Sequence, residues 1–193
     1  MRTVCVFCGS STGAREDYVT AARELGHVMA ERGLRLVFGG GQVGLMGVVA
    51  DAVMEAGGEA VGIMPEALLE KEIGHQRLTD LKVVGTMHER KALMADLADA
   101  FVALPGGYGT FEEFMEVLTW AQLSLHEKPC GLLNVAGFYE PLMALFDRAV
   151  EEGFVRPDHR SLALLEEEPR RMLDLLEIYT PPATEKWVSL EEL

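Results

Sequence analysis

The sequence predicts an α/β fold in which helices cover both faces of a doubly wound parallel sheet. Three observations predict this class. Six strand-like runs alternate with six helical patterns along the 193 residues. Residues 36–38 and 101–104 are almost continuously apolar, as in parallel strands that are covered on both faces. Glycine-rich turns directly follow two of the strand-like runs, as in strand-to-helix turns that bind ligands.

The elements follow one another in regular alternation. Strands are expected at about residues 3–8, 34–38, 59–63, 81–85, 100–104 and 130–134, and helices at about 14–32, 44–57, 87–97, 110–124, 137–152 and 169–178. Right-handed crossovers place the loops after the strands along one edge of the sheet. We therefore predict a single Rossmann-like domain over residues 1–180, followed by a short C-terminal extension over residues 181–193.

Composition argues against several classes of protein. The net charge of -14 argues against a general nucleic-acid surface, which needs clustered Lys and Arg. The apolar runs are short, so no segment is expected to span a membrane. The first residues enter a strand-like run without the apolar core of a secretory signal, and the three cysteines are too few for a disulfide framework. We therefore expect a cytoplasmic protein.

Neither the cysteines nor the histidines predict a metal or redox site. Cys5 and Cys8 form a C-x-x-C string, but on a strand their side chains would face opposite sides, which favours buried structural residues. The five histidines show no metal-ligand spacing. We treat them as surface or packing residues, with His88 in reserve as a site residue.

The most informative stretch is PGGYGTFEE, residues 105–113, which places a glycine turn between an apolar strand and an amphipathic helix expected to open at Thr110. Backbone N–H groups and the helix dipole at such a turn can hold a phosphate. Glu113 lies one turn into the helix, where a carboxylate could act on a neighbouring part of the ligand. Alternatively, Thr110 and Glu113 form a capping box that serves only the helix start.

Two further patterns leave alternatives open. Residues 39–44 match G-x-G-x-x-G, but a dinucleotide fingerprint normally follows the first strand and this one follows the second, which favours a mononucleotide cleft. Arg90 shares one helix side with Met87 and Met94, so it lies on a partly apolar face. It could hold a carboxylate or a phosphate there, or belong to a solvated charged face.

Residues 87–94, MHERKALM, lie one element before the glycine turn, and the two motifs together resemble the LONELY GUY (LOG) family. These enzymes are cytokinin riboside 5′-monophosphate phosphoribohydrolases, often labelled lysine decarboxylases. The family pattern PGGxGTxxE is met at every fixed position, and the accompanying Arg-Lys pair is Arg90-Lys91. The resemblance spans about residues 3–180 and includes Pro65-Glu66. A pyridoxal phosphate decarboxylase is disfavoured, because none of the five lysines has a cofactor-lysine context.

The resemblance implies a hydrolase that cleaves the N-glycosidic bond of a purine riboside 5′-monophosphate, such as a cytokinin riboside monophosphate or AMP, without metal or organic cofactor. It implies catalytic roles for Arg90, Glu113 and Glu66, and a homodimer supported by apolar helix surface over residues 114–125. The implied substrate-binding residues are Gly9, Ser10, Gly41, Met87, Lys91, Gly106, Gly107, Gly109 and Thr110. The alternative is a non-catalytic nucleotide carrier or sensor, which would not need Arg90 and Glu113.

Overall fold

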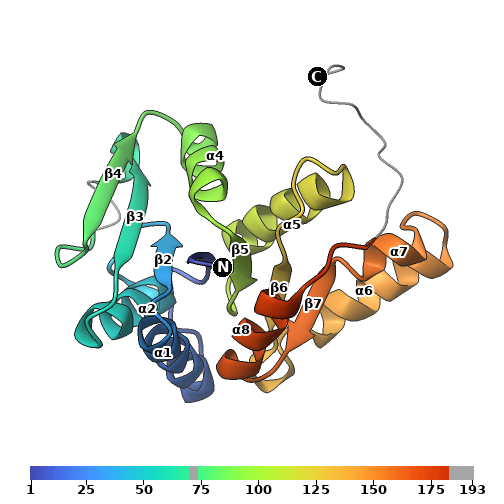
Figure 1. The fold of residues 1–193 in the computed structure, drawn as a ribbon, viewed down its shortest axis with the longest axis horizontal. Helices are drawn as coiled ribbons and strands as arrows, with labels where there is room; N and C mark the ends of the chain where they lie inside the picture. Colours follow the sequence, from blue (N-terminus) through green and yellow to red (C-terminus); the bar gives the residue numbers. More distant parts are fainter. Residues whose placement is uncertain (70–73, 183–193) are drawn as a thin grey trace.

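The computed structural model describes residues 1–69 and 74–182, and within them all strands join one parallel sheet. The strand order is β4-β3-β2-β1-β5-β6-β7 (Figure 1). The strands are β1 (Thr3–Phe7), β2 (Arg35–Phe38), β3 (Ala60–Pro65), β4 (Asp80–Val84), β5 (Ala100–Ala103), β6 (Cys130–Leu133) and β7 (Ala163–Glu166). The order reverses between β1 and β5, which is where ligands bind in doubly wound folds.

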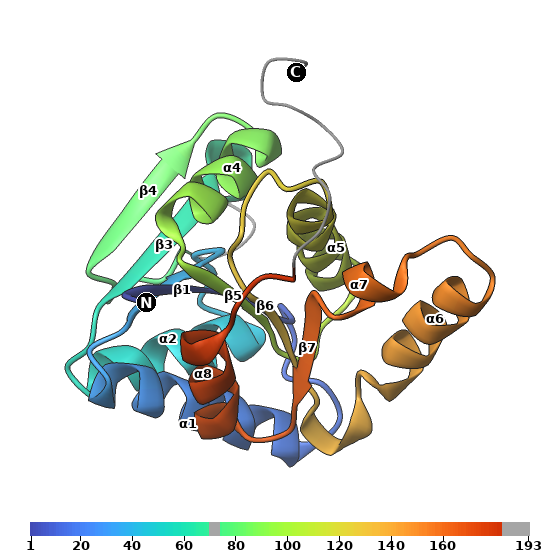
Figure 2. The same cartoon turned by 45° about the vertical axis from the view of Figure 1, so that its right-hand side comes forward.

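Helices cover both faces of the sheet. They are α1 (Glu16–Glu31), α2 (Gly44–Glu55), α3 (Glu66–Leu69), α4 (Met87–Leu97), α5 (Tyr108–Gln122), α6 (Glu140–Glu151), α7 (Pro157–Arg160) and α8 (Pro169–Ile178), with a 3₁₀ turn, η1 (Val135–Gly137), before α6. One hydrophobic core lies between the sheet and α1, α2 and α8, and a second between the sheet and α4, α5 and α6. Figure 2 shows α6 and α7 at the end of the sheet next to β7.

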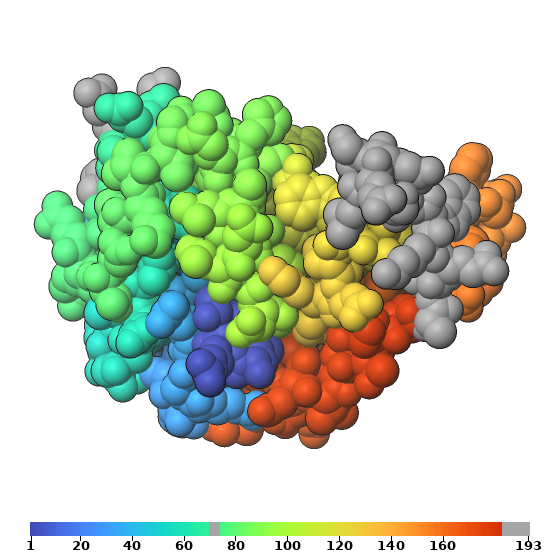
Figure 3. Space-filling view, turned by 45° about the horizontal axis from the view of Figure 1, so that its top comes forward, coloured from blue at the N-terminus to red at the C-terminus, as the bar shows by residue number. Residues whose placement is uncertain are grey.

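Alternate side chains of β1 pack into the cores on the two faces of the sheet. Val4, Val6 and Cys8 belong to the first core, whereas Cys5 and Phe7 belong to the second. The prediction that Cys5 and Cys8 face opposite sides is therefore confirmed, and both thiols are free and buried. On the outer surface, α4 adjoins the segment after α5 (Figure 3), where Lys128 Nζ donates to the Ala95 carbonyl at 2.8 Å.

The six predicted strands and six predicted helices are all present, with ends shifted by three residues or fewer. Strand β7, the helices α3 and α7 and the turn η1 were not predicted from the sequence. The proposed extension over residues 181–193 lies almost wholly outside the described residues. None of the helices in the described part of the chain is long and apolar enough to cross a bilayer.

One predicted boundary was wrong in a way that affects the site. Helix α5 begins at Tyr108 rather than Thr110, and Gly107 is its N-cap without a side-chain cap. Thr110 therefore lies inside the first turn and Glu113 in the second. The alternative in which these two residues form a capping box is wrong, because Gly107 rather than Thr110 is the N-cap and Glu113 lies beyond position N3.

Candidate functional site

Three loops meet at the carboxyl edge of the sheet, where the strand order reverses. They follow β1, β2 and β5 and are joined by backbone hydrogen bonds. Gly9 N donates to the Pro105 carbonyl at 3.1 Å, and Leu45 N donates to the Gly9 carbonyl at 3.0 Å. The glycine turns that the sequence places after different strands therefore form one connected surface.

Glycines in these loops have two different uses. A Cβ on Gly106 would lie 2.1 Å from Thr110 Oγ1, and one on Gly44, which has φ +69°, would lie 2.3 Å from the Ser10 carbonyl carbon. These glycines allow close packing between loops. At Gly107 and Gly109 an added Cβ would meet nothing within 4 Å. The turn is thus tightly packed on its inner side and open on its outer side, where an anion could approach the main chain.

A pocket of about 230 Å³ opens between the loops after β1 and β5. Its lining includes Gly9, Ser10, Gly106 and Gly107 among the predicted substrate-binding residues. Two aromatic residues that sequence reasoning missed, Tyr18 and Phe138, complete one wall and contact each other edge to face at 5.8 Å. No motif marks them, since they come from α1 and from the segment before α6.

Arg90 reaches this edge from α4, whose start is fixed by local sequence. Thr86 is the N-cap and its Oγ1 accepts from Glu89 N at 3.1 Å, while Glu89 Oε2 accepts from Gly85 N at 2.8 Å. The helix therefore begins at Met87, which places Arg90 in its first turn pointing into the sheet edge. Arg90 is only 6% exposed, so the solvated-face alternative is wrong.

The Arg90 guanidinium is held by two main-chain carbonyls, one within β3 and one just after β2. Nε donates to the Ile63 carbonyl at 3.1 Å and Nη2 to the Gly39 carbonyl at 3.0 Å, while Nη1 lies 3.9 Å from the Met87 sulfur. A Cβ on Gly39 would lie 1.9 Å from Nη2. The absence of a side chain at Gly39 therefore makes room for the guanidinium.

Arg90 and Glu113 converge near the end of β1. Burial raises the pKa of the Cys8 thiol well above its usual range, the charge of Glu113 raises it further, and the charge of Arg90 lowers it. Both charges thus lie within electrostatic reach of one thiol, although they come from α4 and α5. Glu113 is half-buried and also has a polar or electrostatic partner. The charges of Arg90 and Glu113 therefore both act at the end of β1, where the loop after this strand begins.

Three other predicted residues lie in different surroundings. Glu66 is exposed at the start of α3, directly after β3. Gly41 forms an antiparallel bridge with Gly74. Lys91 pairs through Nζ with Glu112 at 2.5 Å and Glu116 at 3.0 Å, which ties α4 to α5. The Lys91 ammonium is thus engaged between two helices.

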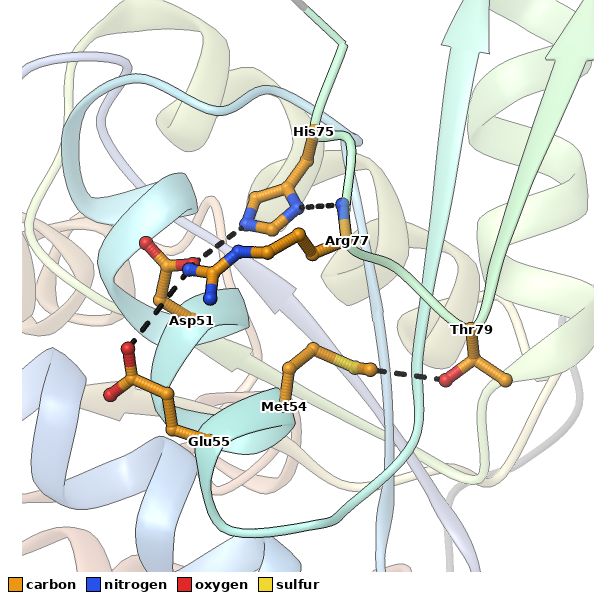
Figure 4. Close-up of polar contacts among 6 residues, drawn as sticks. All are labelled: Asp51, Met54, Glu55, His75, Arg77 and Thr79. Atoms are coloured by element: carbon orange, nitrogen blue, oxygen red, sulfur yellow. Dashed lines mark hydrogen bonds and ion pairs between the residues drawn. The ribbon is translucent and has the colours of Figure 1, made fainter.

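A polar cluster around the buried His75 supports the β2 loop (Figure 4) and was not predicted from the sequence. His75 is 3% exposed, its Nε2 lies 3.1 Å from Asp51 Oδ1, and its Nδ1 accepts from Arg77 N at 3.2 Å. Because Nδ1 accepts a hydrogen bond, the ring proton is assigned to Nε2, which donates to Asp51. The His75 backbone N donates to the Gly40 carbonyl at 3.0 Å. The cluster fixes the turn that receives Arg90, and His75 is a packing residue, one of the two roles expected for the histidines.

Within the described segments, no three His, Cys, Asp or Glu side chains are placed to hold a metal.

Comparison with known proteins adds the decisive observation. A family model described as "Possible lysine decarboxylase" matches residues 46–176. The chain is 51% identical, over 93% of its length and 74% of the relative's, to the probable cytokinin riboside 5′-monophosphate phosphoribohydrolase LOGL2 of Oryza sativa subsp. japonica. It is 50% identical, over 93% and 84%, to the cytokinin riboside 5′-monophosphate phosphoribohydrolase LOG2 of Arabidopsis thaliana. This chain belongs to the LOG family.

Solved structures with the same fold include proteins named for another ligand. The molybdenum cofactor carrier protein of Chlamydomonas reinhardtii aligns with a TM-score of 0.68 at 21% identity, covering 91% of this chain and 96% of that one. The molybdenum cofactor binding protein of Rippkaea orientalis aligns with a TM-score of 0.69 at 21% identity, covering 91% and 95%. At this identity the likeness establishes the LOG-family fold only.

Proposed function

We propose that this protein is a phosphoribohydrolase that hydrolyses the N-glycosidic bond of cytokinin riboside 5′-monophosphates, of AMP, or of both. The products are the free base and ribose 5-phosphate. The observation that carries the proposal is identity of about 50% to relatives named for this reaction; an open glycine turn and the charges of Arg90 and Glu113, both acting at the end of β1, support it. A protein that only bound the nucleotide would need the glycine turn but not Arg90 and Glu113.

The glycine turn is proposed to bind the 5′-phosphate. Gly107 and Gly109 are exposed at the start of α5, where backbone N–H groups and the helix dipole favour an anion. Gly106 and Thr110 shape the turn from its inner side. Gly9, Ser10 and Gly41 extend the same surface and are proposed to contact the substrate. Binding energy at the phosphate then positions the ribose for reaction.

The chemistry is proposed to centre on Glu113. Cleavage of an N-glycosidic bond develops positive charge on the sugar, and a nearby carboxylate can stabilise that charge or orient the attacking water. Arg90, fixed by two carbonyls, would orient Glu113 and the ribose. Glu66 would assist through the ribose hydroxyls or the water. Met87, which is 43% exposed, would border the purine, while substrate contact by Lys91 stays a prediction.

We also propose that the protein is a cytoplasmic homodimer. Three buried free cysteines suit a reducing compartment. The apolar side chains of Met115 and Leu125 are 39% and 37% exposed on and just after α5, and a second copy could cover them. Sedimentation of the purified protein tests the dimer.

Two neighbouring glutamates provide a matched test of the chemistry. Glu113→Gln removes the proposed catalytic charge, whereas Glu112→Gln removes an exposed charge one position away and leaves Glu116 to hold Lys91. We expect Glu113→Gln to lose base release by about 10²–10⁴-fold, and Glu112→Gln to keep most of it. Release of free base from AMP and from an N6-isoprenoid AMP is measured by chromatography. Equal activity of the two variants would remove Glu113 from the mechanism.

A further inference from the structure

A buried tyrosine supports the glycine turn from beneath. Tyr139 immediately precedes α6 and is 1% exposed, and its hydroxyl donates to the Leu104 carbonyl at 2.7 Å. Leu104 is the last residue before Pro105-Gly106-Gly107. A side chain that comes 35 residues later in the chain thus holds the point where β5 becomes the turn.

This hydrogen bond belongs to a series of three that fix the turn at its beginning. Leu104 N donates to the Phe7 carbonyl at 2.9 Å, the Leu104 carbonyl accepts from Tyr139, and the Pro105 carbonyl accepts from Gly9 N at 3.1 Å. Two of these partners are main-chain groups of β1 and the residues after it, and the third is the tyrosine hydroxyl. Three successive polar groups of the main chain are therefore held in fixed orientations, which sets the direction of the following N–H groups.

Tyr139 also contacts the other side of the turn. Phe111, in the first turns of α5, meets the Tyr139 ring edge to face at 6.4 Å, and Phe138 meets it at 5.0 Å. Phe138 in turn lines the pocket beside Gly106 and Gly107. One aromatic ring thus packs against α5 while its hydroxyl holds the end of β5, so the ends of the turn are kept at a fixed separation.

The segment that delivers Tyr139 has an unfavourable backbone conformation. Ala136 has φ 52° and ψ 34°, in the left-handed region that disfavours residues with a Cβ, and Gly137 follows with φ 75°. The Tyr139 backbone N donates to Asn134 Oδ1 at 2.8 Å, which stabilises this turn. Strain of this kind persists where the surrounding structure requires a particular geometry, as at a ligand site.

We propose that Tyr139 is a positioning residue that presets the glycine turn for the 5′-phosphate of the substrate. The inference rests on the proposed function. Without the hydroxyl, the buried Leu104 carbonyl loses its donor, and the peptide before Pro105 must shift for that carbonyl to find another. The shift misaligns the N–H groups that follow in the turn, including those of Gly107 and Gly109. Ligands that carry the phosphate then bind more weakly, whereas ligands without it are unaffected, because preorganisation matters only for groups that use the turn.

The test compares Tyr139→Phe, which keeps the ring, with Tyr179→Phe, which removes a hydroxyl just after α8 whose electrostatic neighbours include Cys130 at the start of β6. Binding of ribose 5-phosphate and of ribose is measured by calorimetry, and kcat/KM is measured for AMP and adenosine. For Tyr139→Phe we expect about a tenfold loss for ribose 5-phosphate and AMP, which corresponds to about 1.4 kcal/mol, and no change for ribose or adenosine. Tyr179→Phe should match the wild type in its binding of ribose 5-phosphate and of ribose and in kcat/KM for AMP and adenosine.

Equal losses for AMP and adenosine, or no loss for either, would overturn the positioning role. If the wild type cleaves no AMP, the proposed function fails. The loss of ribose 5-phosphate binding in Tyr139→Phe then still tests the positioning role of Tyr139. If the wild type binds ribose 5-phosphate no better than ribose, there is no phosphate site to preset and the inference fails. Should Tyr139→Phe not fold, Asn134→Ala, which removes the acceptor for the Tyr139 backbone N, should show the same selective loss to a smaller extent.

Discussion

Gly39→Ala should inactivate the protein without removing any charged group. The added Cβ would lie 1.9 Å from Arg90 Nη2 and 3.0 Å from Cζ. Non-bonded heavy atoms of this kind approach to about 3.5 Å, so the guanidinium must move by about 1.6 Å. Gly39 does not have the positive φ that excludes alanine, so the backbone itself accepts the change. The perturbation therefore acts mainly on the position of Arg90.

The magnitude follows from that displacement. A misplacement of about 1 Å at a positioned group can cost about 100-fold in rate, so kcat for AMP should fall at least that far. Stability should fall by about 1–3 kcal/mol, because the Gly39 carbonyl loses its guanidinium donor and is left unsatisfied. The assay is adenine release under saturating AMP, with denaturant unfolding measured on the same preparation.

A stability-matched control separates the two effects. Gly57 follows α2 at the opposite edge of the sheet, has φ +76°, and leaves open space around an added Cβ. Gly57→Ala should lose about 1–2 kcal/mol through its left-handed backbone and keep wild-type turnover. A folded Gly39→Ala variant with wild-type turnover would refute the reasoning, because the position of Arg90 would then not matter.

Three further outcomes are expected. Arg90→Lys should fail nearly as badly as Arg90→Ala at both low and high salt, because an ammonium cannot reach two carbonyls at once as the guanidinium fork does; substantial AMP cleavage by the lysine variant at low salt would contradict this. Gly106→Ala and Gly109→Ala should both weaken ribose 5-phosphate binding in calorimetry, the first because its Cβ would displace Thr110 and the second because its Cβ would stand in the open space proposed for the phosphate, but only Gly106→Ala should also lower stability in denaturant unfolding. Asp99 is partly desolvated, which favours its neutral form, but two backbone N–H groups at the start of β1 outweigh this and lower its pKa. The contribution of Asp99 to folding stability is therefore present above the unfolded pKa of about 3.9 and is lost as pH falls toward the lower folded pKa. Asp99→Asn should destabilise the protein at pH 7 and far less at pH 3, as measured by thermal unfolding.

The sequence predicted the parts of the fold that depend on local pattern. Continuous apolar runs identified β2 and β5, and helical periodicity placed Arg90 on a partly apolar side of α4, which the structure shows to be buried. The strand β7 was missed because ALLE, residues 163–166, is short, half-exposed and followed by acidic residues, a pattern that does not separate a strand from a helix. The start of α5 was misplaced because two glycines near it suggested a longer turn.

The contacts that complete the site could not be read from the chain. Tyr139 holds Leu104 across 35 residues, and Lys91 pairs with carboxylates on a different helix. Such partnerships depend on how elements pack, and no spacing rule in one sequence encodes them. His75 was correctly expected to be a packing residue, but its support of the turn beneath Arg90 required the position of Asp51 on α2. Motifs thus located the site, and tertiary packing determined its support.

The most direct test of the central claim is a time course with AMP, followed by phosphorus NMR and chromatography together. If Arg90 and Glu113 act on the N-glycosidic bond, adenine and ribose 5-phosphate should appear one for one, with no inorganic phosphate and no adenosine. Adenosine and inorganic phosphate as products would show cleavage of the wrong bond. AMP that binds tightly and stays intact would contradict the account, because the protein would then be a nucleotide carrier or sensor rather than a hydrolase.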